Sequence, residues 1–314
     1  MLRPDTFALT LLLASLTALG PMSSDMYVPS LPDIGHSLHV PIAQVQLTIS
    51  SYLVGFALGQ IIYGPISDRL GRKPVLLVAI VIYGLGSVLC ATTRSIDALV
   101  AARFVQALGG AGAIVLARAV VRDLYSGVRA GRELSLMGSI QAFAPIAAPL
   151  IGGILQTVFG WHASFIRLVI GSIAAGTLTA RLLPETLRKR TTEPLSLATM
   201  GNLYGSVLSH RSFLAHLAIM TTTFVGLYAW VSGASVVIQG VYGLSPLAFG
   251  MTYAVGSLGY MLGTNIAVRI VMRLGLGPMI GIGTAIMAAG GLLMAAVVAF
   301  GLTSVTWLVG SMTV

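Results

Sequence analysis

GQIIYGPISDRLGRKP, residues 59 to 74, is the stretch that decides the fold. It begins as an apolar helical segment, and Gly64-Pro65 predicts a break in that helix. Four charged residues follow within six positions, namely Asp68, Arg69, Arg72 and Lys73, and a new apolar run begins at Val75. Because so few residues cannot form a folded loop domain, the stretch predicts a tight charged turn between two membrane helices. Its cations place that turn on the side of the membrane that retains positive charge.

The composition supports the same prediction. Of 314 residues, 56% are hydrophobic and only 9% are charged, and the mean hydropathy is +0.93. A soluble domain carries about 25% charged residues, so this chain has too few to cover a surface that faces water. Its apolar runs of about 20 residues are long enough to cross roughly 30 Å of hydrocarbon as helices. Long alternating segments, which the strands of a membrane barrel require, are absent from the sequence. We therefore expect an all-α polytopic membrane protein.

The formal net charge of +9 would suggest a nucleic-acid partner in a soluble protein. Here the cations fall in short segments between apolar runs, where they set the orientation of the chain. With the N-terminus inside, 15 of the 18 Lys and Arg residues lie on the cytoplasmic side. The cations therefore indicate contact with membrane lipids and do not indicate a nucleic-acid partner; nothing in the composition predicts an oligomer, so the expected state is a monomer.

Features of an enzyme or a metalloprotein are not found in the sequence. The single cysteine, Cys90, lies in an apolar run, so no disulfide framework or thiolate metal site is expected. There is no glycine-rich phosphate loop ending in Lys-Ser or Lys-Thr, which argues against direct ATP hydrolysis. We expect no metal, no cofactor and no enzyme activity.

Apolar runs predict six helices, a polar linker and three further helices. Residues 1–183 are expected to form an N-terminal six-helix bundle, 184–211 a cytoplasmic linker and 212–314 a partial C-terminal bundle. A last apolar start, 305–314, is too short to span. The first helix is expected to kink at Pro21. The expected helices lie at about 6–33, 42–65, 75–93, 97–118, 133–158, 163–183, 212–236, 246–267 and 279–300, with a basic turn at 269–273.

Several motifs resemble those of a known transporter family. The pattern G-x-x-x-D-R-x-G-R-K, from Gly64 to Lys73, resembles the signature loop between helices 2 and 3 of the major facilitator superfamily. SSDMYVPSLPDI (residues 23–34), AARFVQALGGAGA (101–113) and APIAAPLIGG (144–153) resemble motifs of its bicyclomycin-resistance-type (Bcr/CflA) drug:proton antiporters. GWHASF (160–165) and LPETL (183–187) fit the same family.

The resemblance implies a major facilitator fold with a small-molecule substrate, exporting small amphiphilic drugs or metabolites in exchange for protons, by alternating access, across the bacterial cytoplasmic membrane. Family members have twelve spans, so about nine full helices and part of a tenth leave the second bundle incomplete. The sequence is therefore expected to be a fragment or a truncated protein. The alternative is a truncated, non-transporting membrane remnant that only binds lipid or a partner.

Asp25 and Arg103 are the expected proton-coupling residues. A carboxylate inside a membrane is costly and can hold a proton near neutral pH, although Asp25 could instead be hydrated near the end of its helix. Arg103 cannot lose its proton, so it could pair with Asp25 or adjust the proton affinity of that carboxyl. The alternative for Arg103 is a structural clamp on backbone carbonyls.

Two segments are expected to control access to the cavity. The charged turn and the end of helix 4 would form a gating loop, for which contact with anionic lipid headgroups is the alternative; its members are Gly64, Asp68, Arg69, Gly71, Arg72, Lys73 and Asp123. Helix 5 is expected to bend and pack closely, as a hinge that seals the cavity or as ordinary packing; its residues are Pro145, Pro149, Gly152 and Gly153.

Polar and aromatic residues are the candidates for lining an apolar substrate cavity. A position facing lipid, the interface or a packing partner is the alternative for each of them. The candidates are Tyr27, Tyr52, Gln60, Gln106, Gln141, Phe143, Tyr228, Trp230 and Gln239.

Overall fold

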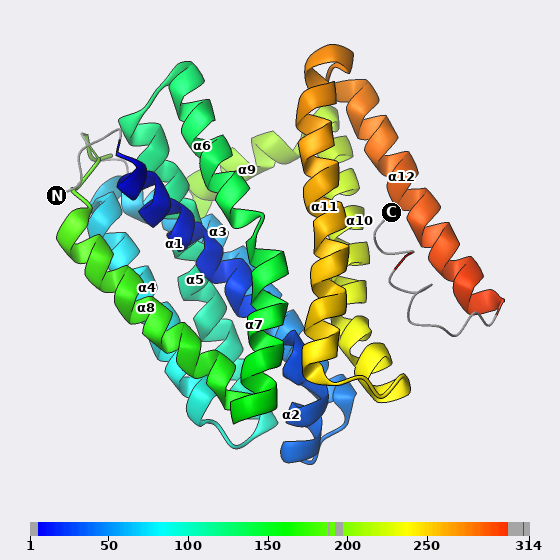
Figure 1. The fold of residues 1–314 in the computed structure, drawn as a ribbon. Helices are drawn as coiled ribbons and strands as arrows, with labels where there is room; N and C mark the ends of the chain where they lie inside the picture. The colour runs from blue at the N-terminus through cyan, green and yellow to red at the C-terminus, as the bar shows by residue number, and fades with distance from the viewer. Residues whose placement is uncertain (1–5, 188, 192–196, 301–309, 311–314) are drawn as a thin grey trace.

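The computed structural model describes residues 6–187, 189–191, 197–300 and 310. Within these residues the chain is helical, without strands, and contains nine helical stretches long and apolar enough to cross a membrane. The first half contains α1 (Phe7–Asp25), η1 (Val28–Ser30), α2 (Leu31–Ser37), α3 (Ile42–Leu70), α4 (Arg72–Thr92), α5 (Ile96–Leu124), α6 (Gly127–Gln141), α7 (Ala144–Phe159) and α8 (His162–Leu182). The second half contains α9 (Leu197–Leu208), α10 (Arg211–Ser235), the π-helical η2 (Val236–Val241), α11 (Pro246–Leu274) and α12 (Leu276–Ala299) (Figure 1).

Helix α5 is the centre of the first half. It packs against α3 and α4 through positions where only glycine fits, because a methyl group at Gly55 would lie 2.5 Å from the Phe104 carbonyl oxygen. Gly109 approaches the backbone of Tyr83 in the same way. With so little side chain between them, these helices bring their backbones together, which is the usual source of cohesion between helices in lipid.

The charged turn predicted after the expected break at Gly64-Pro65 is much shorter in the structure. Helix α3 continues through Pro65 to Leu70, and Gly71 is the single residue between α3 and α4. Gly71 has a φ of 108°, a left-handed conformation that glycine adopts at low cost. Proline is tolerated inside membrane helices because neighbouring groups and water satisfy the carbonyl that it leaves free. The charged residues therefore lie on helix ends instead of in a loop.

Other boundaries also differ from the predictions. The basic segment after position 118 remains helical to Leu124, and the predicted turn at 269–273 lies inside α11. The predicted linker contains α9, and the predicted fifth helix is divided into α6 and α7 at Ala142-Phe143, just before Pro145. Polar residues at the ends of membrane helices reach water, so they do not end a helix as sequence patterns suggest. The predicted apolar start at 305–314 lies outside the described residues except for Gly310.

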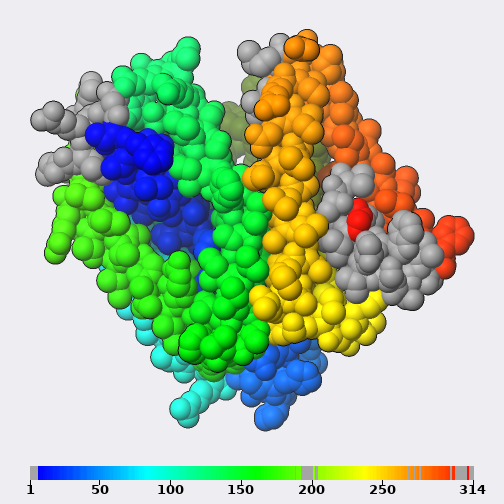
Figure 2. All heavy atoms as spheres, in the orientation of Figure 1, coloured from blue at the N-terminus to red at the C-terminus, as the bar shows by residue number. Residues whose placement is uncertain are grey.

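The two halves meet at one end and separate at the other. Helix α11 packs along α7, and η2 contacts α2 near the same end. Figure 2 shows these segments in contact in the lower part of the view, with a hollow between α6 and the second half in the upper part. The end that carries α2 is therefore closed, and the end that carries the start of α6 is open.

Candidate functional site

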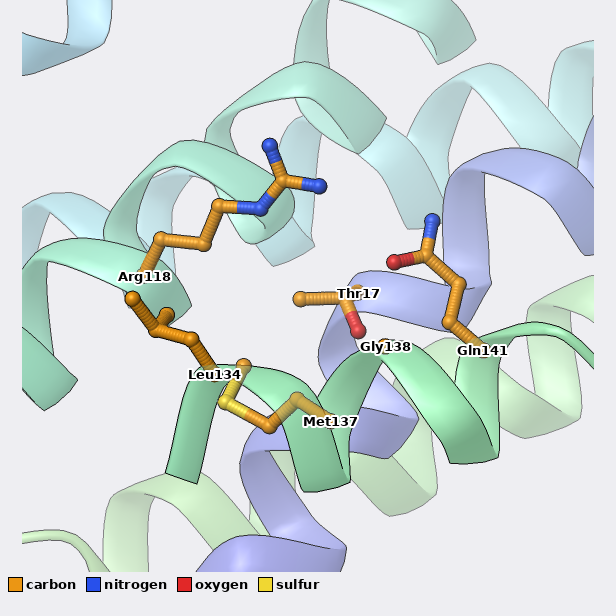
Figure 3. Close-up of a pocket in the computed structure, with 6 residues that line it drawn as sticks. All are labelled: Thr17, Arg118, Leu134, Met137, Gly138 and Gln141. Carbon is orange, nitrogen blue, oxygen red and sulfur yellow. The ribbon is translucent and has the colours of Figure 1, made fainter. Parts of the chain in front are cut away.

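Two adjoining cavities lie in the wall of the first half, toward the open end. The larger, of about 300 Å³, is lined by residues of α1, α5 and α6: Thr17, Arg118, Leu134, Met137, Gly138 and Gln141. The second, of about 270 Å³, is lined by Gln60, Ile114, Val115, Arg118, Arg122 and Leu134. Figure 3 shows the guanidinium of Arg118 and the amide of Gln141 directed into the same space, with Leu134 and Met137 along one side. We call the two cavities together the vestibule.

Only part of the predicted substrate cavity coincides with the vestibule. Gln60 and Gln141 line it, whereas Phe143 is 58% exposed at the break between α6 and α7. Its position follows from the division of that helix, which turns the side chain outward. Trp230 is half-buried on α10, with an indole nitrogen that has no hydrogen-bond partner among the described residues.

Arg103 lies at the centre of a buried cluster, away from the vestibule. Its side chain is fully buried, with the guanidinium carbon 4.3 Å and 4.1 Å from the ring centroids of Tyr27 and Tyr52. Its Nη1 donates to the backbone and side-chain oxygens of Ser23, both at 3.1 Å, and to Oε1 of Gln106 at 2.5 Å. Two aromatic faces and a backbone carbonyl therefore hold the guanidinium, each favourable to a desolvated cation.

Of the two ways in which Arg103 could act on Asp25, the direct ion pair is not formed in this structure. In the described part of the chain both ion pairs belong to Arg72. Because side chains two positions apart on a helix face different directions, the contact of Arg103 with Ser23 does not bring it to Asp25. The arrangement is that of the alternative, a clamp on a carbonyl of the first helix.

Asp25 ends α1 and is only 8% exposed. The hydroxyl of Ser24 donates to its Oδ1 at 2.6 Å. Tyr228 of α10 and Tyr253 of α11 lie close enough to interact electrostatically with this carboxyl. The carboxyl therefore lies where the first half meets the second, and not at a hydrated helix end.

Three of the four predicted residues of helix 5, Pro145, Pro149 and Gly153, contact the second half, whereas Gly152 packs within the first half. A methyl group at Gly152 would collide with the carbonyl of Met26 on one side of α7, and one at Gly153 would lie 2.6 Å from the carbonyl oxygen of Pro246 on the other. The carbonyl of Pro149 lies equally close to Gly250 of α11, 2.5 Å from a methyl group placed there. The carbonyl of Pro145 accepts a hydrogen bond from Ser257 at 3.1 Å.

Side-chain hydrogen bonds reinforce the closed end. The amide of Gln239 donates to the carbonyl of Pro29 at 2.9 Å, and that of Gln46 donates to the carbonyl of Ser232 at 3.2 Å. Both bonds join the first half to the second, so the closed end is sealed by close backbone packing and by hydrogen bonds.

Three of the predicted gating residues, Asp68, Arg72 and Asp123, form a network within the first half. Arg72 pairs with Asp68 at 2.6 Å and, through Nε, with Asp123 at 2.8 Å, which places the end of α5 against the junction of α3 and α4. Lys73 donates to the carbonyl of Ala180 at 2.8 Å. Arg69 has no ion pair among the described residues. Gly64 has open space around its Cα, so close packing does not require glycine there.

Glu185 completes this network, although it was not among the predicted site residues. Its carboxylate accepts hydrogen bonds from the backbone amides of Arg72 and Lys73, at 3.0 and 3.2 Å, and so caps the start of α4. Partial burial raises the pKa of this carboxyl, but backbone N–H groups, including those of Leu187, Arg72 and Lys73, outweigh it and lower the pKa overall. The LPETL motif was the available signal, because its acid follows directly on the end of a helix.

Two helical halves, packed at one end around a buried carboxyl and hollow at the other, form the architecture of a membrane transporter. Known proteins agree with this class. Residues 13–314 match the family model described as Major Facilitator Superfamily. The bicyclomycin resistance protein homolog of Haemophilus influenzae is 32% identical over 290 residues, which cover 92% of this chain and 73% of that protein.

An uncharacterised transporter of this type from Bacillus subtilis is 39% identical over 267 residues, covering 84% of this chain and 66% of that protein. The chain thus spans about two thirds of the length of this relative. Among solved structures, the xylose transporter XylE of E. coli, in a partially occluded inward open conformation, superposes with a TM-score of 0.77 at 17% identity. That match covers 98% of this chain and 80% of the other. The chain belongs to the major facilitator superfamily, and the predicted family and fold are confirmed.

Proposed function

We propose that this protein exports small amphiphilic drugs or metabolites in exchange for protons, by alternating access. The observation that carries the proposal is the asymmetry of the two ends: backbone packing between α7 and α11 closes one, and the vestibule lies toward the other. A protein that alternates between two such closures exposes one site to each side of the membrane in turn. The names of relatives agree with a drug as cargo, since they include a bicyclomycin resistance protein homolog and a chloramphenicol resistance protein.

The open end would face the cytoplasm. The network of Arg72, Asp123 and Glu185 lies at the ends of helices α3, α5 and α8, which also carry Arg69, Arg122 and Arg181. Positive charge concentrates on the cytoplasmic side of bacterial membrane proteins. We therefore place the N-terminus and the mouth of the vestibule on the cytoplasmic side of the bacterial inner membrane.

Asp25 would carry the exchanged proton. Burial disfavours the charged form of a carboxyl, and among the described residues no cation lies within ion-pair distance of Asp25. Its electrostatic interaction with Tyr228 and Tyr253 would let a change in its charge act on the second half. Arg103, locked between two rings, would supply a fixed positive field without taking up protons.

Everted membrane vesicles that contain the protein test this proposal. Chloramphenicol uptake should rise when the vesicle interior is acidified and should fall when the pH gradient is collapsed. Asp25→Asn should abolish the response to the gradient, whereas Asp97→Asn, which changes an exposed carboxyl at the start of α5, should leave it intact. Chloramphenicol uptake by the parent protein that equals that of empty vesicles would refute export of this drug and would favour the alternative, a membrane protein that binds lipid or a partner without transport.

A further inference from the structure

We infer that Arg118 selects the cargo, and that the preferred cargo is an amphiphile carrying a carboxylate or a comparable anionic group. The inference rests on the proposed export function and adds the chemical class of what is exported. It concerns a residue outside the Asp25 and Arg103 cluster. Fifteen positions separate Arg118 from Arg103 on α5, which is about 22 Å along a helix.

Arg118 is placed to meet a solute before it reaches Asp25. It is one of two residues that line both cavities, the other being Leu134. Its side chain is exposed and directed into the space that Gln141 faces from the other side, above the buried Thr17 (Figure 3). Leu134 and Met137 supply an apolar wall beside these polar groups. An apolar surface with a few convergent polar groups is what an amphiphilic ligand requires.

The vestibule has an unbalanced positive charge. Arg118 and Arg122 line it, and no Asp or Glu is among its lining residues in the described chain. The nearest acids in sequence are already engaged: Glu133 accepts a hydrogen bond from Thr10 at 2.7 Å, and Asp123 pairs with Arg72. No Asp or Glu occurs after Glu193 in the sequence, so the second half as given brings no carboxylate to face these arginines. A cleft lined by one sign of charge concentrates solutes of the opposite sign.

The guanidinium group determines which anions fit. It is planar, always charged, and donates two parallel hydrogen bonds to a carboxylate. The amide of Gln141 can donate to a carbonyl of the same ligand. A permanent cation of the same size would meet the same two arginines and be repelled. The expected cargo is therefore a zwitterion or an anion with a large apolar body.

A matched pair of dyes tests the inference by equilibrium binding. Tetramethylrhodamine free acid is a zwitterion, and its methyl ester is a cation with the same ring system. Fluorescence anisotropy with the purified protein should show the free acid binding at least about tenfold more tightly, the size of one charge-assisted contact. Arg118→Gln should abolish this preference, and Arg118→Lys, which keeps the charge but not the two parallel hydrogen bonds, should retain only part of it. Arg94→Gln, an exposed arginine in the turn between α4 and α5, is the control and should change nothing.

The outcomes separate this inference from the proposed function. Equal binding of the two dyes, absent binding, or a preference that survives Arg118→Gln overturns the inference, even where a pH gradient drives export. A preference that depends on Arg118, without transport in proteoliposomes under a pH gradient, refutes export and leaves the selectivity of the vestibule standing. An anionic lipid headgroup has the same chemistry as the cargo. The dye experiment is therefore repeated in nanodiscs of phosphatidylcholine with and without phosphatidylglycerol. If the preference for the free acid disappears when phosphatidylglycerol is added, the site binds lipid and the inference for cargo is overturned.

Discussion

Gly250→Ala should open the closed end of the transporter. The added methyl group would lie 2.5 Å from the carbonyl oxygen of Pro149, whereas ordinary contact begins near 3.4 Å. Helices α7 and α11 would have to separate by about 0.9 Å, and neither atom belongs to a flexible side chain that could move aside. Overpacking of this kind costs about 1–3 kcal/mol. This changes the ratio of closed to open molecules by roughly 5- to 150-fold.

Pulsed electron paramagnetic resonance measures that shift. Spin labels on cysteines introduced at the exposed positions His36 of α2 and Val241 of η2 span the closed end. Because Cys90 is the single cysteine, a Cys90→Ser background leaves these two as the labelled sites. Gly250→Ala should move population from the short distance to a longer one. Gly263→Ala, also on α11 but with open space around it, is the matched control. The reasoning is refuted if both variants keep the parent distribution, or if both change it equally.

Three further predictions concern the two ends of the molecule. Arg72→Lys should lower the melting temperature in detergent, because lysine cannot hold Asp68 and Asp123 together as the guanidinium does. Arg69→Lys is the control and should leave the melting temperature unchanged. Equal melting temperatures for the two variants would contradict the network. Glu185→Gln should weaken the cap of α4 by about 0.5–2 kcal/mol. The pKa of Glu185 is lowered in the folded protein, so its ionised carboxylate stabilises the fold at a pH above the ordinary pKa of 4.5, and this stability is lost as the pH falls below that value. The stability of the Glu185→Gln variant should therefore depend less on pH in this range. A variant with the same acid unfolding profile as the parent would argue against this role. Gln239→Ala removes a hydrogen bond to Pro29 and should increase the long-distance population in the resonance experiment, while an unchanged distribution would show that the bond does not hold the end closed.

The number and order of the membrane helices could be predicted from the sequence, because hydrocarbon permits only long apolar helices or closed barrels. The ends of the helices could not. Gly64-Pro65 predicts a break, yet α3 continues to Leu70, and the turn is reduced to Gly71. At the membrane surface, water and side chains satisfy backbone groups in either conformation, so a local pattern does not decide where a helix ends.

The candidate site could also be predicted only in part from the sequence. The residue pattern around Asp25 and Arg103 predicts two buried charges, and both are buried. The partners of these two residues depend on which helix face meets which neighbour, and this cannot be predicted from the sequence. In the structure, Tyr27, Tyr52 and Ser23 surround the guanidinium of Arg103, where a pairing with the carboxylate of Asp25 could also have been expected. Arg118 appeared in the sequence only as one cation of a basic segment. Because α5 remains helical to Leu124, Arg118 lies on a helix that lines the vestibule and not in a basic loop.

The two faces of α7 have a mechanical consequence. Gly152 packs on the backbone of Met26, directly after α1 in the same half, and Gly153 packs on the backbone of α11 in the other half, so neither contact interlocks side chains. Surfaces of this kind can slide past one another without any side chain changing rotamer. Helix α7 can therefore serve as the bearing on which one half tilts against the other, and its low resistance to sliding would let small differences in charge or occupancy decide which way the molecule opens.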